Sequence, residues 1–290
     1  MGAGQVLRCG RTVFDLARPR IMGVLNVTPN SFSDGGRYFN AARAIEHARR
    51  MMDDGADLID IGGESTRPGA MPVDEAEELR RVIPLVAALA GQGVPVSVDT
   101  RKPAVMRAAL DAGAAMINDV CGLTAPGALE AVAAADAGVC LMHMQGDPRT
   151  MQEAPAYDDV VAEVRGFLLA RATACEAAGI ARERIVLDPG FGFGKTLKHN
   201  LALLAGLPAL AAAGYPVLAG LSRKSSLGEL TGRPVDERLA ASIAAALAAV
   251  ARGASLLRVH DVRETHDALV VWLAAEGAGR TATRSEPPPT

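Results

Sequence analysis

Apolar and polar positions along the chain alternate between two patterns. Eight short runs are apolar almost throughout and rich in β-branched or small residues, which is typical of strands buried on both faces of a parallel sheet. These predicted strands are Ile21–Asn26, Leu58–Gly62, Val94–Asp99, Ala115–Asp119, Val139–His143, Ile185–Asp188, Pro216–Leu221 and Ser255–Val259. Amphipathic segments separate them and predict helices at Ala41–Asp54, Asp74–Gly91, Pro103–Ala112, Pro126–Ala135, Asp158–Ala178, Leu197–Ala213, Asp236–Arg252 and Val262–Ala275.

Local signals mark the ends of several predicted helices. Asp74 and Asp236 are candidate N-caps, because a short side chain with an acceptor oxygen can bind the free N–H groups of a first helical turn. Glycines stand where the chain leaves four of the helices, at Gly55, Gly113, Gly179 and Gly253.

Strands that alternate with helices over about 260 residues predict a (β/α)8 barrel. An open, doubly wound sheet is the alternative, but eight regular units without a topological break favour closure. Val6–Leu7 and Val13–Phe14 flank a Cys-Gly-Arg turn and predict a β-hairpin that caps the bottom of the barrel. The prediction is one domain over residues 1–275, followed by a Gly-, Thr-, Ser- and Pro-rich tail, 276–290, that is expected to be disordered.

The composition narrows the class of partner. The chain has 290 residues and a formal net charge of −3, with Lys and Arg scattered along it. This balance argues against a nucleic-acid footprint and favours small-molecule ligands. The four cysteines show no Cys-x-x-Cys spacing, which is typical of reduced thiols. We find no signal-peptide pattern and no membrane-spanning apolar stretch, so a cytoplasmic protein is expected.

Polar residues follow nearly every predicted strand, where the active site of such a barrel is built. They are Asn26, the stretch GGESTRPG from Gly62, Asp99-Thr100, Asn118-Asp119, His143, Asp188, Ser222-Arg223-Lys224 and Arg258-Val259-His260. Any one of them could simply cap the next helix. Eight polar strand ends on one rim favour a ligand site instead.

The residue types at these strand ends indicate two kinds of ligand group. Asp99, Asn118 and Asp188 each follow an apolar run, and buried carboxylates and amides need partners. Such a set suits a flat heterocycle that presents several N–H donors. Lys224, Arg258 and His260 form a cationic group on the last two strands, which suits an oxyanion such as phosphate. Solvated surface charges are the alternative for these three residues.

The glycine-rich stretch LDPGFGFGKT, residues 187–196, superficially looks like a phosphate-binding P-loop. A P-loop needs glycine where this chain has Pro189, so the match fails. We expect Asp188 to be its key residue, the glycines to let the backbone approach a ligand, and Lys195-Thr196 simply to lead into the next helix.

Two long loops complete the set of candidate features. NVTPNSFSDGGRYFN follows the first strand and GGESTRPGAMPVDE follows the second. Both are too long for simple turns and are candidate lids, with passive surface excursions as the alternative.

Several motifs together resemble the bacterial dihydropteroate synthases. They are IMGVLNVTPNSFSDGG, DLIDIGGESTRPGA, VPVSVDT, MINDVCG, LMHMQGDPRTMQ, IVLDPGFGFGK, GLSRKSS and RVHDV, in the family's order over residues 20–275. Asn30 departs from the pattern, since many members carry Asp there. The resemblance implies a (β/α)8 barrel, a homodimer, and a transferase of folate biosynthesis. It also implies that 6-hydroxymethyl-7,8-dihydropterin diphosphate and p-aminobenzoate give 7,8-dihydropteroate and diphosphate, that Mg2+ assists, and that sulfonamides compete.

The resemblance also implies roles for individual residues. Pterin binding falls to Asp99, Asn118, Asp188 and Lys224, and diphosphate binding to Thr66, Arg67, Arg258 and His260. The p-aminobenzoate side falls to Phe32, Arg67, Pro68, Phe193 and Ser225, and Asn26 is the expected Mg2+ ligand. Asp99, Lys224 and Arg258 are the expected catalytic residues.

The implied mechanism is dissociative: diphosphate leaves first, and the aniline nitrogen then attacks a pterin methylene cation. The rival hypotheses are a pterin-binding methyltransferase barrel and a non-catalytic pterin-binding paralogue. Neither requires the diphosphate and second-substrate motifs that are present.

Overall fold

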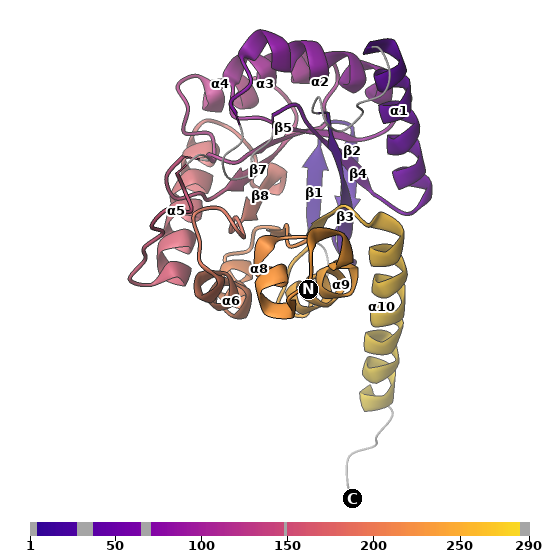
Figure 1. The fold of residues 1–290 in the computed structure, drawn as a ribbon, viewed down its shortest axis with the longest axis vertical. Helices are drawn as coiled ribbons and strands as arrows, with labels where there is room; N and C mark the ends of the chain where they lie inside the picture. The colour runs from indigo at the N-terminus through magenta and orange to yellow at the C-terminus, as the bar shows by residue number, and fades with distance from the viewer. Residues whose placement is uncertain (1–4, 28–36, 65–70, 148–149, 285–290) are drawn as a thin grey trace, which may run out of the picture.

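The computed structural model describes residues 5–27, 37–64, 71–147 and 150–284 (Figure 1). Its strands are β1 Val6–Cys9, β2 Thr12–Asp15, β3 Arg20–Asn26, β4 Leu58–Gly62, β5 Val96–Asp99, β6 Met116–Asp119, β7 Gly138–Met142, β8 Ile185–Asp188, β9 Leu218–Ala219 and β10 Leu256–Val259. Its α-helices are α1 Arg37–Asp53, α2 Glu75–Ala90, α3 Pro103–Asp111, α4 Ala128–Ala133, α5 Val160–Ala177, α6 Leu197–Ala205, α7 Leu207–Ala211, α8 Ser225–Thr231, α9 Leu239–Val250 and α10 Val262–Arg284. Short 3-10 turns lie at Arg182–Arg184 and Val235–Glu237.

The eight strands β3 to β10 form the predicted parallel barrel among the described residues, with the helices outside it (Figure 1). Each strand pairs with its neighbour in the order β8-β7-β6-β5-β4-β3-β10-β9. An isolated parallel bridge between Leu187 and Val217 joins β8 to the segment before β9. The ring of pairs therefore closes, as the unbroken series of β-α units predicted.

Alternation along the strands sorts the side chains into two environments. Residues such as Ile59, Ile61, Val96 and Val98 pack outward in a cluster with the helices. The intervening residues form a separate cluster inside the barrel, made of Met22, Leu58, Met116, Cys140, Val186, Leu218 and Leu256 together with Leu7, Cys9, Phe14 and Leu16 of the hairpin. Interior positions two residues further along each strand lie one layer closer to the C-terminal end of the barrel, its mouth.

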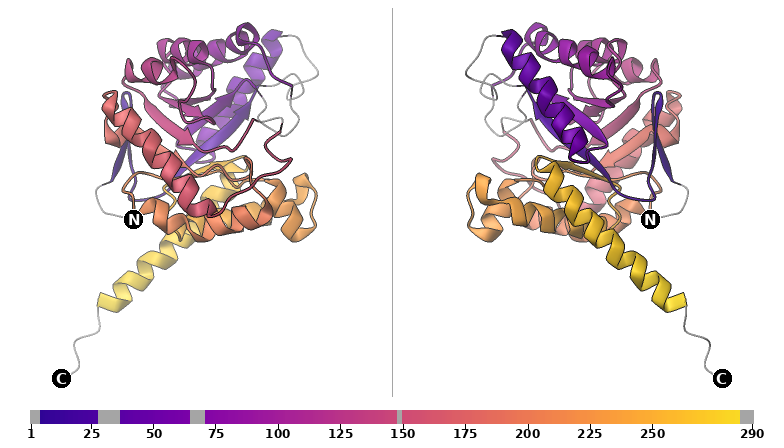
Figure 2. Two further views of the ribbon diagram at one scale, coloured as in Figure 1. Left: turned by 90° about the vertical axis from the view of Figure 1, so that its left-hand side faces the viewer. Right: turned by 90° about the vertical axis from the view of Figure 1, so that its right-hand side faces the viewer.

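The predicted hairpin β1–β2 is confirmed and closes the base of the barrel (Figure 2). Its side chains Leu7 and Cys9 are fully buried in the interior cluster. The approach is so close that a Cβ on Gly138, at the start of β7, would lie 2.5 Å from the Cys9 sulfur. The hairpin therefore closes the base of the barrel with apolar side chains, and the pocket above it has an apolar floor.

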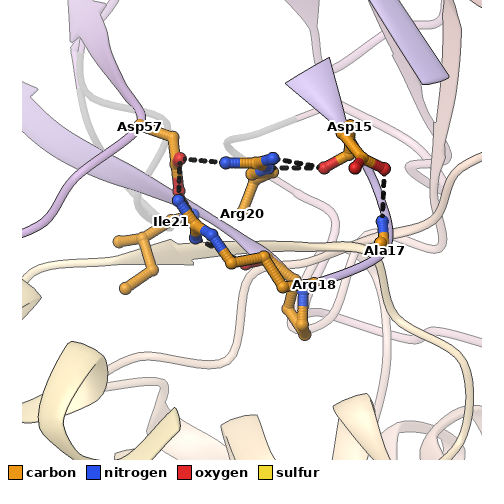
Figure 3. Close-up of polar contacts among 7 residues, drawn as sticks. Asp15, Ala17, Arg18, Arg20, Ile21 and Asp57 are labelled. Atoms are coloured by element: carbon orange, nitrogen blue, oxygen red, sulfur yellow. Dashed lines mark hydrogen bonds and ion pairs between the residues drawn. The ribbon is translucent and has the colours of Figure 1, made fainter. Parts of the chain in front are cut away.

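A group of hydrogen bonds around the Asp57 carboxylate joins the hairpin to the barrel at the base (Figure 3). Asp57 accepts hydrogen bonds from Arg18 Nη2 at 2.7 Å, from Arg20 Nη1 at 2.8 Å and from the backbone N–H of Ile21 at 2.9 Å. Arg20 also donates from Nε to the carbonyl oxygen of Asp15 at 2.7 Å, at the end of β2. The base is thus a polar junction in which each group has a partner.

Several boundary predictions are confirmed. Asp74 caps α2 by accepting the N–H of Glu77 at 2.7 Å. The four predicted exit glycines all have positive φ, between 90° and 104°, which residues with a side chain rarely adopt: Gly55, Gly113, Gly179 and Gly253.

Other boundaries differ from the predictions. Asp236 does not cap a helix, because it lies in a 3-10 turn and α9 begins at Leu239. The helix expected over Leu197–Ala213 is two helices, because Pro208 lacks an N–H and the chain restarts after Gly206. Helix α8 was not predicted.

The last helix also differs from its prediction. It continues to Arg284, so the part of the expected disordered tail up to that residue is helical and extends away from the barrel (Figure 2). The remainder, 285–290, lies outside the described residues. Across the described chain, none of the helices has both the length and the apolar character that crossing a membrane requires.

Candidate active site

The mouth of the barrel holds a pocket lined by side chains from six strand ends and the loops after them. Its lining is Asp99, Asn118, Val120, Met142, Asp188, Phe191, Phe193, Gly220, Lys224 and Arg258. Strand pairing explains why these residues meet: Asp99 pairs with Asn118, and Met142 pairs with Asp188, each one interior step above the apolar floor. The structure therefore brings together all four residues predicted for the pterin, with Arg258 and Phe193.

Arg258 sits at the centre of the charged part of the pocket. Its Nε donates to Asp60 Oδ2 at 2.6 Å and its Nη2 to Asp99 Oδ2 at 3.0 Å. Although burial opposes its charge, these two carboxylates raise the pKa of Arg258 above its ordinary value. Two of its five N–H donors are thus engaged, and the others remain for a ligand.

Asp60 lies beneath Arg258 and is fully buried. Its Oδ2 also accepts a hydrogen bond from Asn118 Nδ2 at 3.1 Å. Among the described residues, Asp60 Oδ1 and Asn118 Oδ1 are buried and have no hydrogen-bond donor. Since buried polar atoms are normally paired, the amide oxygen of Asn118 in the pocket lining fits a ligand that presents an N–H group.

The two carboxyl groups in the pocket lining have raised pKa values. Burial raises the pKa of Asp99 from 3.8 to about 7, and the nearby Asp60 carboxylate adds to the rise while Arg258 opposes it. Burial also raises the pKa of Asp188, against the N–H of Gly190, which donates to Asp188 Oδ1 at 2.7 Å. Ionisation of both carboxyl groups is therefore unfavourable in the pocket. A cationic or N–H-rich ligand would stabilise their ionised forms.

Lys224 faces these carboxylates from the loop after β9. Burial lowers its pKa from 10.5 to about 8, and Arg258 lowers it further while Asp188 and Asp99 oppose the shift. Its Nζ lies 4.2 Å from the centre of the Phe193 ring, in a cation–π contact. Arg223, just before it, has φ of 58°, an uncommon conformation for a side-chain-bearing residue.

The glycine-rich stretch after β8 packs against the end of β7. A Cβ on Gly190 would lie 2.0 Å from the carbonyl oxygen of His143, and one on Gly194 would lie 2.6 Å from that of Gln145. Glycine is required here because another backbone occupies the space. The loop is a wall of the pocket rather than a phosphate cradle.

Of the seven other predicted site residues, three lie around this pocket and four lie outside the described residues. Asn26 ends β3, and its side-chain oxygen lies beside Gly62 at the end of the neighbouring β4, 3.6 Å from where a Cβ would stand. His260 Nδ1 and Ser222 Oγ form a hydrogen bond of 3.0 Å. The backbone N–H of His260 donates to the same oxygen at 3.2 Å. Ser225 lines a neighbouring polar groove of about 560 Å3. Phe32, Thr66, Arg67 and Pro68 lie outside the described residues, as does Asn30.

Two residues of the site were missed in the sequence. Asp60 interrupts an apolar strand at an interior position, and that break in the pattern is the signal that could have found it. Lys195 was expected only to lead into a helix. It is instead 3% exposed and hydrogen-bonded, whereas Thr196 caps α6 by accepting the N–H of His199 at 3.2 Å.

Comparison with known proteins agrees with this geometry. The family model described as "Pterin binding enzyme" matches residues 22–260. A dihydropteroate synthase of Neisseria meningitidis serogroup B is 55% identical over 279 residues, which cover 94% of this chain and 98% of that protein.

Two solved structures are similar over nearly the whole chain. A dihydropteroate synthase of Xanthomonas albilineans with 4-aminobenzoic acid is 57% identical, with a TM-score of 0.88, and the match covers 94% of this chain and 98% of that one. A dihydropteroate synthase of Burkholderia cenocepacia complexed with 7,8-dihydropteroate is 54% identical, with a TM-score of 0.89, and the match covers 97% of this chain and 100% of that one.

Proposed function

The chain belongs to the pterin binding enzymes and, among them, to the dihydropteroate synthases, and on that premise we propose how its barrel mouth carries out the reaction. The enzyme is a transferase that joins the dihydropterin of 6-hydroxymethyl-7,8-dihydropterin diphosphate to the amine of p-aminobenzoate. The products are 7,8-dihydropteroate and diphosphate. The observation that carries the proposal is the polar interior layer formed by Asp99, Asn118, Asp188, Lys224 and Arg258 above an apolar floor.

The pterin lies in this layer with its donor-rich pyrimidine edge toward the acidic side. Asp188 and Asp99 accept N–H groups of the ring, and Asn118 offers its open amide oxygen and so is matched to a further donor. Lys224 meets an acceptor of the ring from the opposite side. A ligand that satisfies these atoms offsets the cost of burying them.

Charge in the pocket favours a cation on the pterin. Three carboxylates, Asp60, Asp99 and Asp188, face two cations, Lys224 and Arg258, so a positive charge that develops at the pterin methylene completes the balance. Asp99 has a pKa of about 7, and the developing charge favours its ionised form. Asp99 thus stabilises the cation electrostatically, and no side chain acts as a covalent nucleophile.

The diphosphate lies toward the ends of β3, β4 and β10. Arg258 directs its remaining N–H donors to it, and His260, two residues further along the chain, contributes as well. Thr66 and Arg67 are assigned to the same anion. The described residues hold no group of three or more His, Cys, Asp or Glu side chains suited to a metal. Asn26 would hold a magnesium ion through its amide oxygen, a hard ligand of the kind that Mg2+ prefers. When bound, Mg2+ neutralises charge on the departing diphosphate.

The p-aminobenzoate lies against the glycine-rich wall, on the side of the Phe193 ring. Phe193 offers its ring beside Lys224, and Ser225 lies in the adjoining polar groove, with Phe32, Arg67 and Pro68 completing this side. In this arrangement the weakly nucleophilic amine meets the pterin methylene carbon after diphosphate departs.

We also propose that the protein is a cytoplasmic homodimer. All four cysteines are free thiols, as in a reducing compartment. Large apolar side chains at Leu230, Val235 and Leu239 are exposed around α8 and α9, and a second copy of the chain would cover them.

The test is a two-substrate assay with the purified protein. Dihydropteroate and diphosphate should form only when dihydropterin diphosphate, p-aminobenzoate and Mg2+ are all present. Diphosphate release without p-aminobenzoate, at the full rate, would indicate a hydrolase. Pterin binding without any product would favour the non-catalytic paralogue.

A further inference from the structure

Lys195 is a buried lysine for which the reaction above has no use. Its side chain makes three contacts, to His143 Nδ1 at 3.1 Å, to the carbonyl oxygen of His143 at 3.2 Å and to that of Phe193 at 2.9 Å. Burial lowers the pKa of Lys195 from 10.5 to about 7, so the protonated and neutral amines are both present near neutral pH. The protonated form has three N–H donors and no acceptor, and each contact then matches one donor. Burial of a lysine is rare, because its charge is costly to desolvate.

The partner residue His143 has the right protonation state to accept. Burial, and to a smaller extent the adjacent Lys195, lower the pKa of its imidazole from 6.5 to about 4. The ring is therefore neutral near neutral pH and can present Nδ1 as an acceptor. It is held in place by an edge-on contact with Phe167, with ring centres 5.1 Å apart.

The contacts of Lys195 connect two elements that are distant in sequence. His143 follows β7, while Phe193 lies in the glycine-rich wall after β8. Other carbonyl oxygens of the wall are also bonded: that of Gly194 accepts the Tyr157 hydroxyl at 2.9 Å, and that of Gly192 accepts Gln152 Nε2. Lys195 adds hydrogen bonds that join the wall to the end of β7, and one of them is to the backbone of Phe193, whose ring lines the pocket.

We propose that Lys195 is a positioning residue for the p-aminobenzoate side of the site. By binding the Phe193 carbonyl oxygen and the end of β7 together, it fixes the Phe193 ring 4.2 Å from the Lys224 ammonium. The inference rests on the proposed function, which places p-aminobenzoate against that ring. It predicts that loss of the Lys195 hydrogen bonds weakens the binding of p-aminobenzoate. Binding of the pterin, which Asp99 and Asn118 hold, should stay nearly unchanged.

The experiment compares Lys195→Met with Lys198→Met, a matched loss of a lysine that is exposed on the same segment. KM for p-aminobenzoate is measured at saturating dihydropterin diphosphate, and the affinity for dihydropterin diphosphate with Mg2+ is measured by calorimetry. In Lys195→Met, KM should rise about tenfold or more, because three buried hydrogen bonds are lost together, while pterin affinity stays within about twofold of wild type. Lys198→Met should match wild type in both.

Two outcomes overturn the inference: a KM in Lys195→Met within about twofold of the Lys198→Met value, or a loss of pterin affinity as large as the rise in KM. If Lys195→Met does not fold, His143→Phe takes its place, because it keeps an aromatic ring and removes the Nδ1 acceptor. That variant should raise KM for p-aminobenzoate by roughly two- to fivefold. An unchanged KM would refute the positioning role. Absence of dihydropteroate with the wild type would instead refute the proposed function.

Discussion

The two ends of the barrel each hold a carboxylate bound by arginine, and they differ in how completely the carboxylate is satisfied. At the base, Asp57 uses both oxygens, for Arg18, Arg20 and a backbone N–H (Figure 3). At the mouth, Asp60 uses Oδ2 for two donors, while Oδ1 has no donor among the described residues. The carboxylate at the base is fully paired and stabilises the fold. The carboxylate at the mouth belongs to a polar layer that is not fully paired, as expected of a ligand site.

The largest expected effect is at the mouth, where Arg258→Ala removes the cation shared by Asp60 and Asp99. Breaking a buried pair by removing one partner should lower the free energy of unfolding by about 3–5 kcal/mol. Urea denaturation measures the loss.

Arg258→Ala also tests the role of Arg258 as an anion ligand. Affinity for the pterin diphosphate should fall more than affinity for the free hydroxymethyl pterin. Because both ligands are compared on one variant, the loss of stability cancels. Equal losses would contradict a diphosphate role.

The next effect separates binding from stability. Asp188→Asn should weaken pterin binding by roughly 2–4 kcal/mol, because it removes the negative charge and replaces one acceptor oxygen with an NH2 donor that faces the N–H groups of the ligand. The fold should tolerate the change, since the substitution removes a carboxyl group whose burial raises its pKa. Calorimetry and thermal denaturation on the same sample check both parts. Unchanged pterin affinity would place Asp188 outside the site.

The base should show the reverse behaviour. Asp57→Asn weakens contacts with two arginines and should lower the free energy of unfolding by about 2 kcal/mol, without changing KM for either substrate. Arg18→Ala is the control, because Arg18 is 45% exposed and its loss should cost less than about 1 kcal/mol. A change in KM for either substrate in Asp57→Asn would mean that the base and the mouth of the barrel are coupled.

The last effect is a pH dependence specific to the mouth. The pKa of Asp99 is about 7 in the folded protein and 3.8 without the fold, so the folded state binds more protons between these values. Its stabilising contribution is present below about pH 4 and is lost as the pH rises to about 7. The free energy of unfolding of Asp99→Asn, minus that of wild type, should therefore increase from about pH 5 to about pH 8. A constant difference would show that Asp99 does not titrate in this range.

Much of the fold was predictable because strand burial leaves a direct mark on the sequence. The apolar runs located all eight barrel strands, since each must be buried on both faces. Helix α8 escaped because it is a single short segment after Arg223, whose positive φ has no sequence signal. The split between α6 and α7 was signalled by Pro208 inside the predicted helix, and the amphipathic pattern obscured it.

The site was predictable where it depends on position along a strand. Asp99, Asn118 and Asp188 follow from the rule that barrel chemistry lies at strand ends, and the register brings them together. Lys195 could not be found this way, because its partner His143 is 52 residues away in sequence. Lysine is usually solvated, and its burial depends on a contact between two loops that only the folded chain defines.

The closure at β9 has a consequence for motion. This strand has two residues, and in the described chain it joins β8 through the Leu187–Val217 bridge. Its amides should exchange with deuterium through local opening, faster than those of the longer pair β3–β4. Asp188 ends one side of this seam and Lys224 follows the other. A pterin bound to both residues would bridge β8 and β9 and slow that exchange. The substrate would therefore stabilise the closure of the barrel.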